Sequence, residues 1–206
     1  MGRIKLLLPY GVSTILETIV TELTACPSLD TVVVVTSYEP DRIAALLATY
    51  PVQCVFNPVY ARTELLVSLQ VGLRALAAEV RAALIVLGDH PRLRLDTIQR
   101  VIEAYQPGAL VISSYRMKRG HPILIDRVWW DEVLALPEIA TLRGFVRAHE
   151  DRIRYVVMET DSVLKDVDTP EDYQSLRTAD ALSAQRNAST KQVPTERIQE
   201  MQHGDQ

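Results

Sequence analysis

Short runs of β-branched and aliphatic residues alternate along this chain with longer segments that carry apolar residues on one face. The run at residues 31–37, TVVVVTS, is apolar without interruption, as strands are when both faces of a sheet are covered. The pattern predicts further strands at residues 52–56, 83–88 and 109–113, and helices at residues 13–25, 39–49, 65–78 and 95–105. It therefore predicts an α/β fold with a mostly parallel sheet covered by helices.

The order of elements is less regular after Gly120. Strands are predicted at residues 121–125 and 153–158 and helices at residues 128–136 and 141–149, which we interpret as an insertion flanking the sheet. A last helix is predicted from Thr169, because Thr169 can cap it and Pro170 suits its first position. From residue 179 onward the chain is polar, which predicts one domain over residues 1–178 followed by a disordered tail at residues 179–206.

Charge and hydropathy exclude several classes of protein. The 206 residues carry a formal net charge of −4, with Lys and Arg scattered along the chain, which argues against a nucleic-acid partner. No apolar run is long enough to cross a bilayer and no signal-peptide pattern opens the chain, so we expect no membrane partner and a cytoplasmic location. Cys26 and Cys54 show no metal-ligand spacing, and we expect both to be free thiols.

Two acidic positions could hold a metal ion. Asp89 directly follows the predicted strand ALIVLG, and ligands of open parallel sheets bind beyond the carboxyl ends of the strands. A single carboxylate there suits Mg²⁺, although a turn aspartate is an equal alternative. Asp166 and Asp168 precede the last helix, where they could instead stabilise only the helix N-terminus. Asp89 and Asp168 form a metal pair only if the fold brings them together.

Other candidate residues carry weaker signals. Lys5 could neutralise a triphosphate, and Gly120 permits close approach of a ligand. His121 could donate to a substrate or to a neighbouring carbonyl group. Asn57 suits a turn after its strand, and Ser68 on the following helix could equally face solvent.

In sequence order the chain contains MGRIKLLLPYG, TVVVVTS, NPVYARTELLVSLQVGL, LIVLGDHP, RGHPILI and KDVDTPEDY. This ordered set resembles the MobA-like nucleotidyltransferases, especially the molybdenum cofactor cytidylyltransferases, over about residues 1–178. The resemblance implies a Rossmann-like, three-layer nucleotidyltransferase fold similar to the GT-A fold. It also implies Mg²⁺-dependent transfer of a nucleoside monophosphate from CTP or GTP to a phosphate-bearing acceptor such as a molybdopterin, with release of pyrophosphate. A molybdoenzyme or its chaperone is the protein partner that the resemblance suggests.

The same resemblance implies roles for individual residues. Lys5 would contact the nucleotide phosphates, and Asn57 and Ser68 would lie near the base or ribose. Asp89 and Asp168 would hold Mg²⁺. Gly120 and His121 would border the acceptor pocket.

The sequence departs from the family pattern at its start. Relatives begin with a strand and a glycine-rich loop, LAAGxSxRMG, whereas this sequence begins with Met1-Gly2, which match the end of that motif. The missing strand would lie in the centre of the sheet, so the fold is expected to lack its first strand, and we expect Met1 to be an internal methionine of a longer protein. Thr63-Glu64 replaces a common glycine and methionine, which leaves the choice of base open.

Two other functions compete with this interpretation. A degenerate transferase could bind a nucleotide, a pterin or a partner protein without turnover. Asp166-Val167-Asp168 also matches the DxD motif of nucleotide-sugar glycosyltransferases. In that class, however, the motif ends a strand in the middle of the domain, where this chain has LGDHP.

Overall fold

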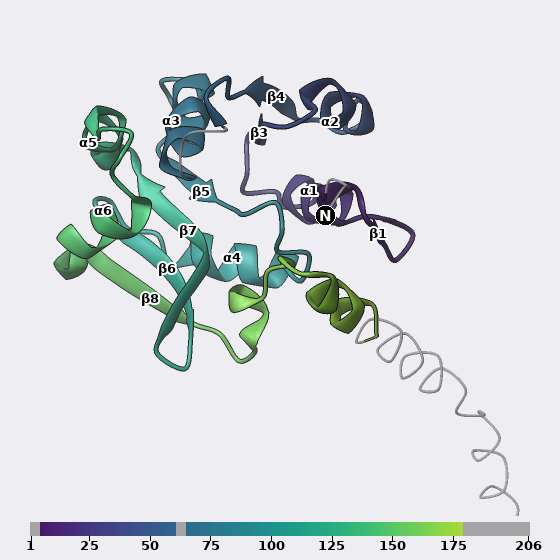
Figure 1. Cartoon of the computed structure of the whole chain (residues 1–206). Coiled ribbons are helices and arrows are strands. Elements are labelled where there is room, and N and C mark those ends of the chain that lie inside the picture. Colours follow the sequence, from purple (N-terminus) through teal and green to yellow (C-terminus); the bar gives the residue numbers. More distant parts are fainter. Residues whose placement is uncertain (1–4, 61–64, 179–206) are drawn as a thin grey trace, which may run out of the picture. The chain divides into compact units, whose positions relative to one another are not determined.

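The computed structural model describes residues 5–60 and 65–178 (Figure 1). It divides into two units, Met1–Asp166 and Val167–Gln206, each described by itself below. Met1, Thr63-Glu64 and the predicted tail at residues 179–206 lie outside the described residues.

The first unit contains most of the predicted elements. Its strands are β1 (Pro9–Tyr10), β2 (Ser13–Thr14), β3 (Val33–Thr36), β4 (Gln53–Phe56), β5 (Ala82–Ile85), β6 (Leu110–Tyr115), β7 (Lys118–Asp126) and β8 (Ile153–Val157). Its α-helices are α1 (Ile15–Thr24), α2 (Pro40–Leu46), α3 (Leu65–Ala75), α4 (Leu95–Glu103), α5 (Trp130–Ala135) and α6 (Leu142–Ala148). Short 3₁₀ helices include η1 (Lys5–Leu7), η3 (Arg127–Trp129), η4 (Glu150–Arg152) and η5 (Asp161–Leu164).

The strands form two separate larger sheets and one short hairpin. Strands β3 and β4 pair in parallel, and the other large sheet has the order β5-β7-β6-β8. In that sheet β7 is antiparallel to both β5 and β6, while β6 and β8 are parallel. β7 lies inside this sheet, between β5 and β6. The prediction that the region after Gly120 flanks the sheet is therefore wrong. Hydrophobic periodicity predicted that strand but carries no information on strand order.

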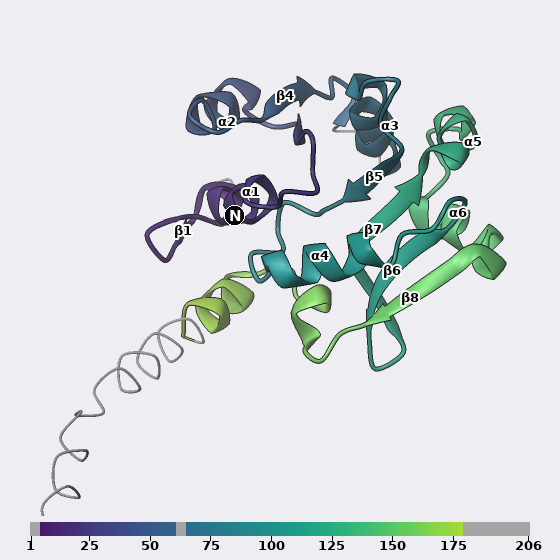
Figure 2. The same ribbon diagram turned by 180° about the vertical axis from the view of Figure 1, so that it is seen from behind.

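Both faces of the four-stranded sheet are covered, as the fold class requires (Figure 2). Leu110 and Ile112 of β6 face a core formed with α3, α5 and α6. Val111, between them, faces the opposite core with α4 and η5. Because successive side chains of a strand point to opposite faces, the apolar run of β6 supplies both cores. The structure is therefore a three-layer α/β fold.

The start of α1 shows how local sequence sets an element. The Thr14 hydroxyl accepts a hydrogen bond from the Glu17 backbone N–H (3.2 Å), and the Glu17 carboxylate accepts one from the Thr14 N–H (2.9 Å). This capping box satisfies N–H groups that the helix itself cannot. It fixes where α1 begins, directly after β2.

A cavity of about 440 Å³ separates β3 from β5. Its walls are these two strands together with apolar side chains of α1 and α3, among them Ile19, Val20, Leu69 and Leu73. Within the described residues, β3 pairs only with β4 and β5 only with β7, so each strand has an unpaired edge. β3 is consequently only partly buried, although its sequence predicted burial on both faces. The cavity is thus a slot with one strand on either side and one helix on either face.

The second unit contains the predicted last helix, which is helical over residues 170–178. The Asp172 backbone N–H donates to the Thr169 hydroxyl (3.1 Å), and the Thr169 N–H donates to the Asp172 carboxylate (2.8 Å). Thr169 is thus the predicted cap. Across the described residues of both units, no helix combines the length and the apolar character that a membrane span requires.

Candidate functional site

The carboxyl ends of β5, β6 and β8 meet at one edge of the sheet. Since β7 runs antiparallel to β5 and β6, and β8 is parallel to β6, the three strands point the same way. The amino end of β7, with Gly120 and His121, lies at that same edge. Asp89 follows β5 by four residues, at the place where open α/β sheets bind their ligands.

Lys5 and Asp89 meet at this edge although 84 residues separate them. The Lys5 Nζ atom lies 2.7 Å from Asp89 Oδ2, and the two side chains are 34% and 22% exposed. Leu6, next to Lys5, lies 3.5 Å from the position that a Cβ atom on Gly88 would take. The segment preceding β1 is therefore packed against the end of β5, and two predicted site residues form one ion pair.

A cation can be held here. The Asp89 carboxylate already pairs with an ammonium group and retains solvent access, and a single carboxylate is a normal protein ligand for Mg²⁺ when substrate phosphates supply the other oxygens. Across residues 5–60 and 65–178, no group of three or more His, Cys, Asp or Glu side chains is assembled for a metal. The donor set therefore fits a metal that is bound largely by its substrate.

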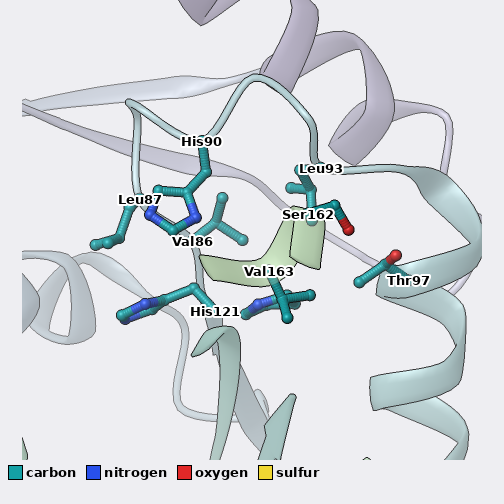
Figure 3. Close-up of a pocket in the computed structure, with 9 residues that line it drawn as sticks. Val86, Leu87, His90, Leu93, Thr97, His121, Ser162 and Val163 are labelled. Atoms are coloured by element: carbon teal, nitrogen blue, oxygen red, sulfur yellow. The ribbon is translucent and has the colours of Figure 1, made fainter. Parts of the chain in front are cut away.

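His90, the residue after Asp89, lies beside His121 of β7. The rings of His90 and His121 are 5.7 Å apart and inclined by 77°, so the edge of one faces the other. Both line a cavity of about 10 Å³ with Thr97 across from them, which is room for about one water molecule (Figure 3). The cavity is too small for a nucleotide.

His121 is a neutral imidazole at pH 7. Burial, followed by the nearby His90, lowers its pKa from 6.5 to about 4, and Asp89 opposes this shift. Its Nε2 atom is buried without a hydrogen-bond partner among the described residues. The sequence left open whether His121 meets a substrate or a carbonyl group. Its Nε2 meets no carbonyl within the part of the chain described, and its role toward an acceptor remains a prediction.

Gly120 is required by packing inside the first unit. A Cβ atom at this position would lie 2.3 Å from the Val163 carbonyl oxygen and 2.9 Å from its carbon. The backbone of β7 thus touches the backbone of η5, which leads toward Asp166. The close approach predicted for Gly120 is therefore made by the protein itself, and its contact with an acceptor remains a prediction.

Asn57 and Ser68 belong to one hydrogen-bonded unit at the end of β4. Asn57 is fully buried, and its Nδ2 group and the Ser68 oxygen lie 3.1 Å apart. The Asn57 Oδ1 atom accepts a hydrogen bond from the Val59 N–H, 3.1 Å away. The Asn57 turn predicted from the sequence is thereby confirmed, and Ser68 is held against it rather than facing solvent freely. Their contact with a base or ribose stays a prediction.

Asp166 and Asp168 fall on either side of the division between the units. Asp166 ends the first unit, and Asp168 lies in the second, just before the helix at residues 170–178. The segment that carries both is neither strand nor helix. The pairing of Asp168 with Asp89 therefore remains a prediction.

Sequence reasoning missed two features of this edge. The first is His90, which directly follows Asp89 in LGDHP and whose ring faces that of His121. The second is the turn between β6 and β7, which carries Arg116, Lys118 and Arg119 around a fully exposed Met117. Arg119 pairs with Glu150 and donates to the Tyr155 hydroxyl at 2.7 Å. The run RMKR in the sequence was the signal for this cationic turn.

Three solved structures share this fold. Rv0371c of Mycobacterium tuberculosis H37Rv, solved with manganese, is 24% identical, with 86% of this chain and 93% of that chain covered and a TM-score of 0.73. A nucleotidyl transferase from Methanothermobacter is 23% identical, with 87% and 86% covered and a TM-score of 0.74. A 4-diphosphocytidyl-2C-methyl-D-erythritol synthase from Anaerococcus prevotii is 17% identical, with 83% and 87% covered and a TM-score of 0.70.

The comparison with curated proteins gives no match. The family described as the MobA-like NTP transferase domain, by contrast, matches residues 1–153, which include Lys5, Asp89 and the whole of the β5-β7-β6 arrangement. The predicted fold and family are thus confirmed, and the chain belongs to the MobA-like NTP transferase family of nucleotidyltransferases.

Proposed function

We propose that this protein transfers a nucleoside monophosphate from CTP or GTP to a phosphate-bearing small acceptor, with Mg²⁺ and with release of pyrophosphate. The observation that carries this proposal is the ion pair of Lys5 and Asp89 at the carboxyl edge of β5. A cation and a metal-binding carboxylate side by side suit a triphosphate with its metal ion. Manganese in the similar Rv0371c structure supports a divalent ion in this fold.

Catalysis of this reaction depends on neutralising the charge of the phosphates more than on covalent chemistry by the protein. An acceptor phosphate oxygen attacks the α-phosphorus, the bond from that phosphorus to the bridging oxygen of the β-phosphate breaks, and pyrophosphate leaves with the bond electrons. Lys5 would neutralise charge on the phosphates as it builds up. Asp89 would orient the metal ion, which supplies electrostatic stabilisation of the phosphate oxygens when bound. Asn57 and Ser68 would hold the nucleoside.

The cationic turn between β6 and β7 supports an anionic acceptor. Arg116, Lys118 and Arg119 lie within four residues of the turn that follows β6, in a protein whose net charge is −4. Of these three side chains, Arg119 forms an ion pair with Glu150. Positive charge concentrated on one turn attracts phosphate groups and raises their local concentration. A phosphorylated pterin such as molybdopterin is one acceptor of this kind, and a molybdoenzyme or its chaperone would be the protein that receives the product.

The slot between β3 and β5 supports a longer functional protein. It has an unpaired strand edge on each side and apolar walls, which suits one additional strand. Leu6 lines the slot and lies beside Gly88, three residues after the end of β5. Such a strand would run parallel to β5 and would be followed by the phosphate-binding loop expected upstream of Met1. The competing function, a protein that binds without turnover, is favoured only if this strand is lacking.

Pyrophosphate release tests the proposal. The protein extended upstream in frame would be mixed with CTP, GTP or ATP, Mg²⁺ and a molybdopterin, and pyrophosphate would be followed by a coupled enzymatic assay. We expect release with CTP or GTP, and a loss of at least about a hundredfold in Asp89→Asn, the scale of removing one electrostatic contact in a transition state. Asp131→Asn, at an exposed position of α5, is the matched control and should keep full activity. Equal rates for the two variants would refute the role of Asp89.

A further inference from the structure

Lys5 pairs with the Asp89 carboxylate, which the proposed function assigns to the metal ion. Its Nζ atom lies 2.7 Å from Asp89 Oδ2, which is a full ion-pair contact between two partly buried side chains. We infer that Lys5 keeps divalent cations off Asp89 until a nucleotide arrives, so that metal and nucleotide enter the site together. This inference rests on the proposed function, because it concerns the metal ligand named there.

Electrostatics favour exclusion of the metal while the pair is intact. An ammonium group in contact with a carboxylate oxygen neutralises that carboxylate and repels a second cation brought close to it. Both side chains are about two-thirds to four-fifths buried, so water screens this repulsion less than at an open surface. Mg²⁺ gives up its hydration water reluctantly and gains little from one carboxylate that is already paired. Lys5 therefore competes effectively with a metal ion that arrives alone.

A triphosphate reverses this balance. It brings several negative charges that attract both the ammonium group and the metal ion, and the lysine side chain has a flexible four-carbon stem that can follow them. Once Lys5 moves to a phosphate, Asp89 becomes available to the metal, and the phosphates supply the oxygen ligands that Asp89 alone does not. By thermodynamic linkage, nucleotide tightens metal binding and metal tightens nucleotide binding by the same factor.

The test measures binding of Mn²⁺ as the probe, by the electron paramagnetic resonance signal of the free ion, with and without CTP or GTP. In Lys5→Met without nucleotide we expect Mn²⁺ to bind at least about fivefold tighter than to the wild type, the scale of releasing one partly screened ion pair. Nucleotide should then improve Mn²⁺ binding less in this variant than in the wild type. Equal Mn²⁺ affinity of the two proteins without nucleotide would overturn the inference.

Two further variants keep the test decisive. Arg42→Met removes the cation of a surface ion pair, Arg42 with Glu39 at 3.1 Å, and should leave Mn²⁺ binding unchanged. Lys5→Arg keeps the charge and should keep the exclusion, so it tests the inference even if Lys5→Met does not fold. If Lys5→Arg binds Mn²⁺ tighter than the wild type by the same factor as Lys5→Met does, the inference is contradicted.

Asp89→Asn separates the inference from the proposed function. If this variant binds Mn²⁺ with nucleotide as well as the wild type does, the metal site itself is elsewhere and the proposed function loses its metal ligand. If Asp89→Asn loses that binding while Lys5→Met matches the wild type, the metal site stands and only the role of Lys5 fails.

Discussion

Replacing Gly120 with alanine should destabilise the protein through a single backbone clash. The new Cβ atom would lie 2.3 Å from the Val163 oxygen, 2.9 Å from the Val163 carbon and 3.1 Å from a methyl group of Leu164. The first two neighbours are backbone atoms, so β7 and η5 must move apart rather than a side chain rotate. Overpacking of this kind costs ~3 kcal/mol, which for a chain of this length lowers Tm by ~6–12 °C.

The assay is urea denaturation followed by circular dichroism, together with a thermal melt. Gly144→Ala is the matched control, because its nearest neighbour is the Thr141 hydroxyl at 3.2 Å and Gly144 lies within α6. Alanine is the better helix former by about 1 kcal/mol, which offsets that contact, so this control should stay close to the wild type. A Gly120→Ala protein within about 0.5 kcal/mol of the wild type would refute the packing argument, since surface substitutions alone reach that size.

Two other perturbations follow from buried polar groups. Burial lowers the folded-state pKa of His121 from 6.5 to about 4, so the neutral imidazole stabilises the folded protein above pH 6.5. This contribution, on the order of 3 kcal/mol, is lost as the pH falls toward 4. Unfolding free energies at pH 7 and pH 4.5 should therefore differ less in His121→Gln than in the wild type, and an equal pH dependence would count against the shift. Gln70 donates to the Val133 and Leu136 carbonyl oxygens at 2.8 and 3.0 Å. Gln70→Leu should cost about 1–3 kcal/mol in urea denaturation because both acceptors lose their donor, and an unchanged midpoint would contradict this.

Much of the fold could be predicted because local signals and tertiary structure agree. The run at residues 31–37 contains β3, and the helix predicted at residues 13–25 contains α1. The place of β7 could not be predicted, because a strand's hydrophobic pattern is the same at the edge and in the centre of a sheet when both faces are covered. The low burial of β3 depends on the slot beside it, which is likewise a tertiary feature.

The candidate site was predictable in its residue types and not in its contacts. Asp89 stands out because it follows a buried strand, but nothing local joins it to Lys5, 84 residues away. Gly120 was interpreted as a point of ligand approach, whereas the neighbour that excludes its Cβ atom is the Val163 backbone. Pairwise contacts across the fold decide such roles, and spacing along the chain does not encode them.

We expect the edge that carries Lys5 and Asp89 to bind a nucleoside triphosphate with its metal ion once the slot is filled. Calorimetric titration with CTP, GTP and ATP in the presence of Mg²⁺ tests it directly, using the 206-residue chain and a form extended upstream in frame. We predict binding heat for CTP or GTP with the extended form, and weaker binding or none with the 206-residue chain. Absence of binding to both forms would show that this edge is not a nucleotide site.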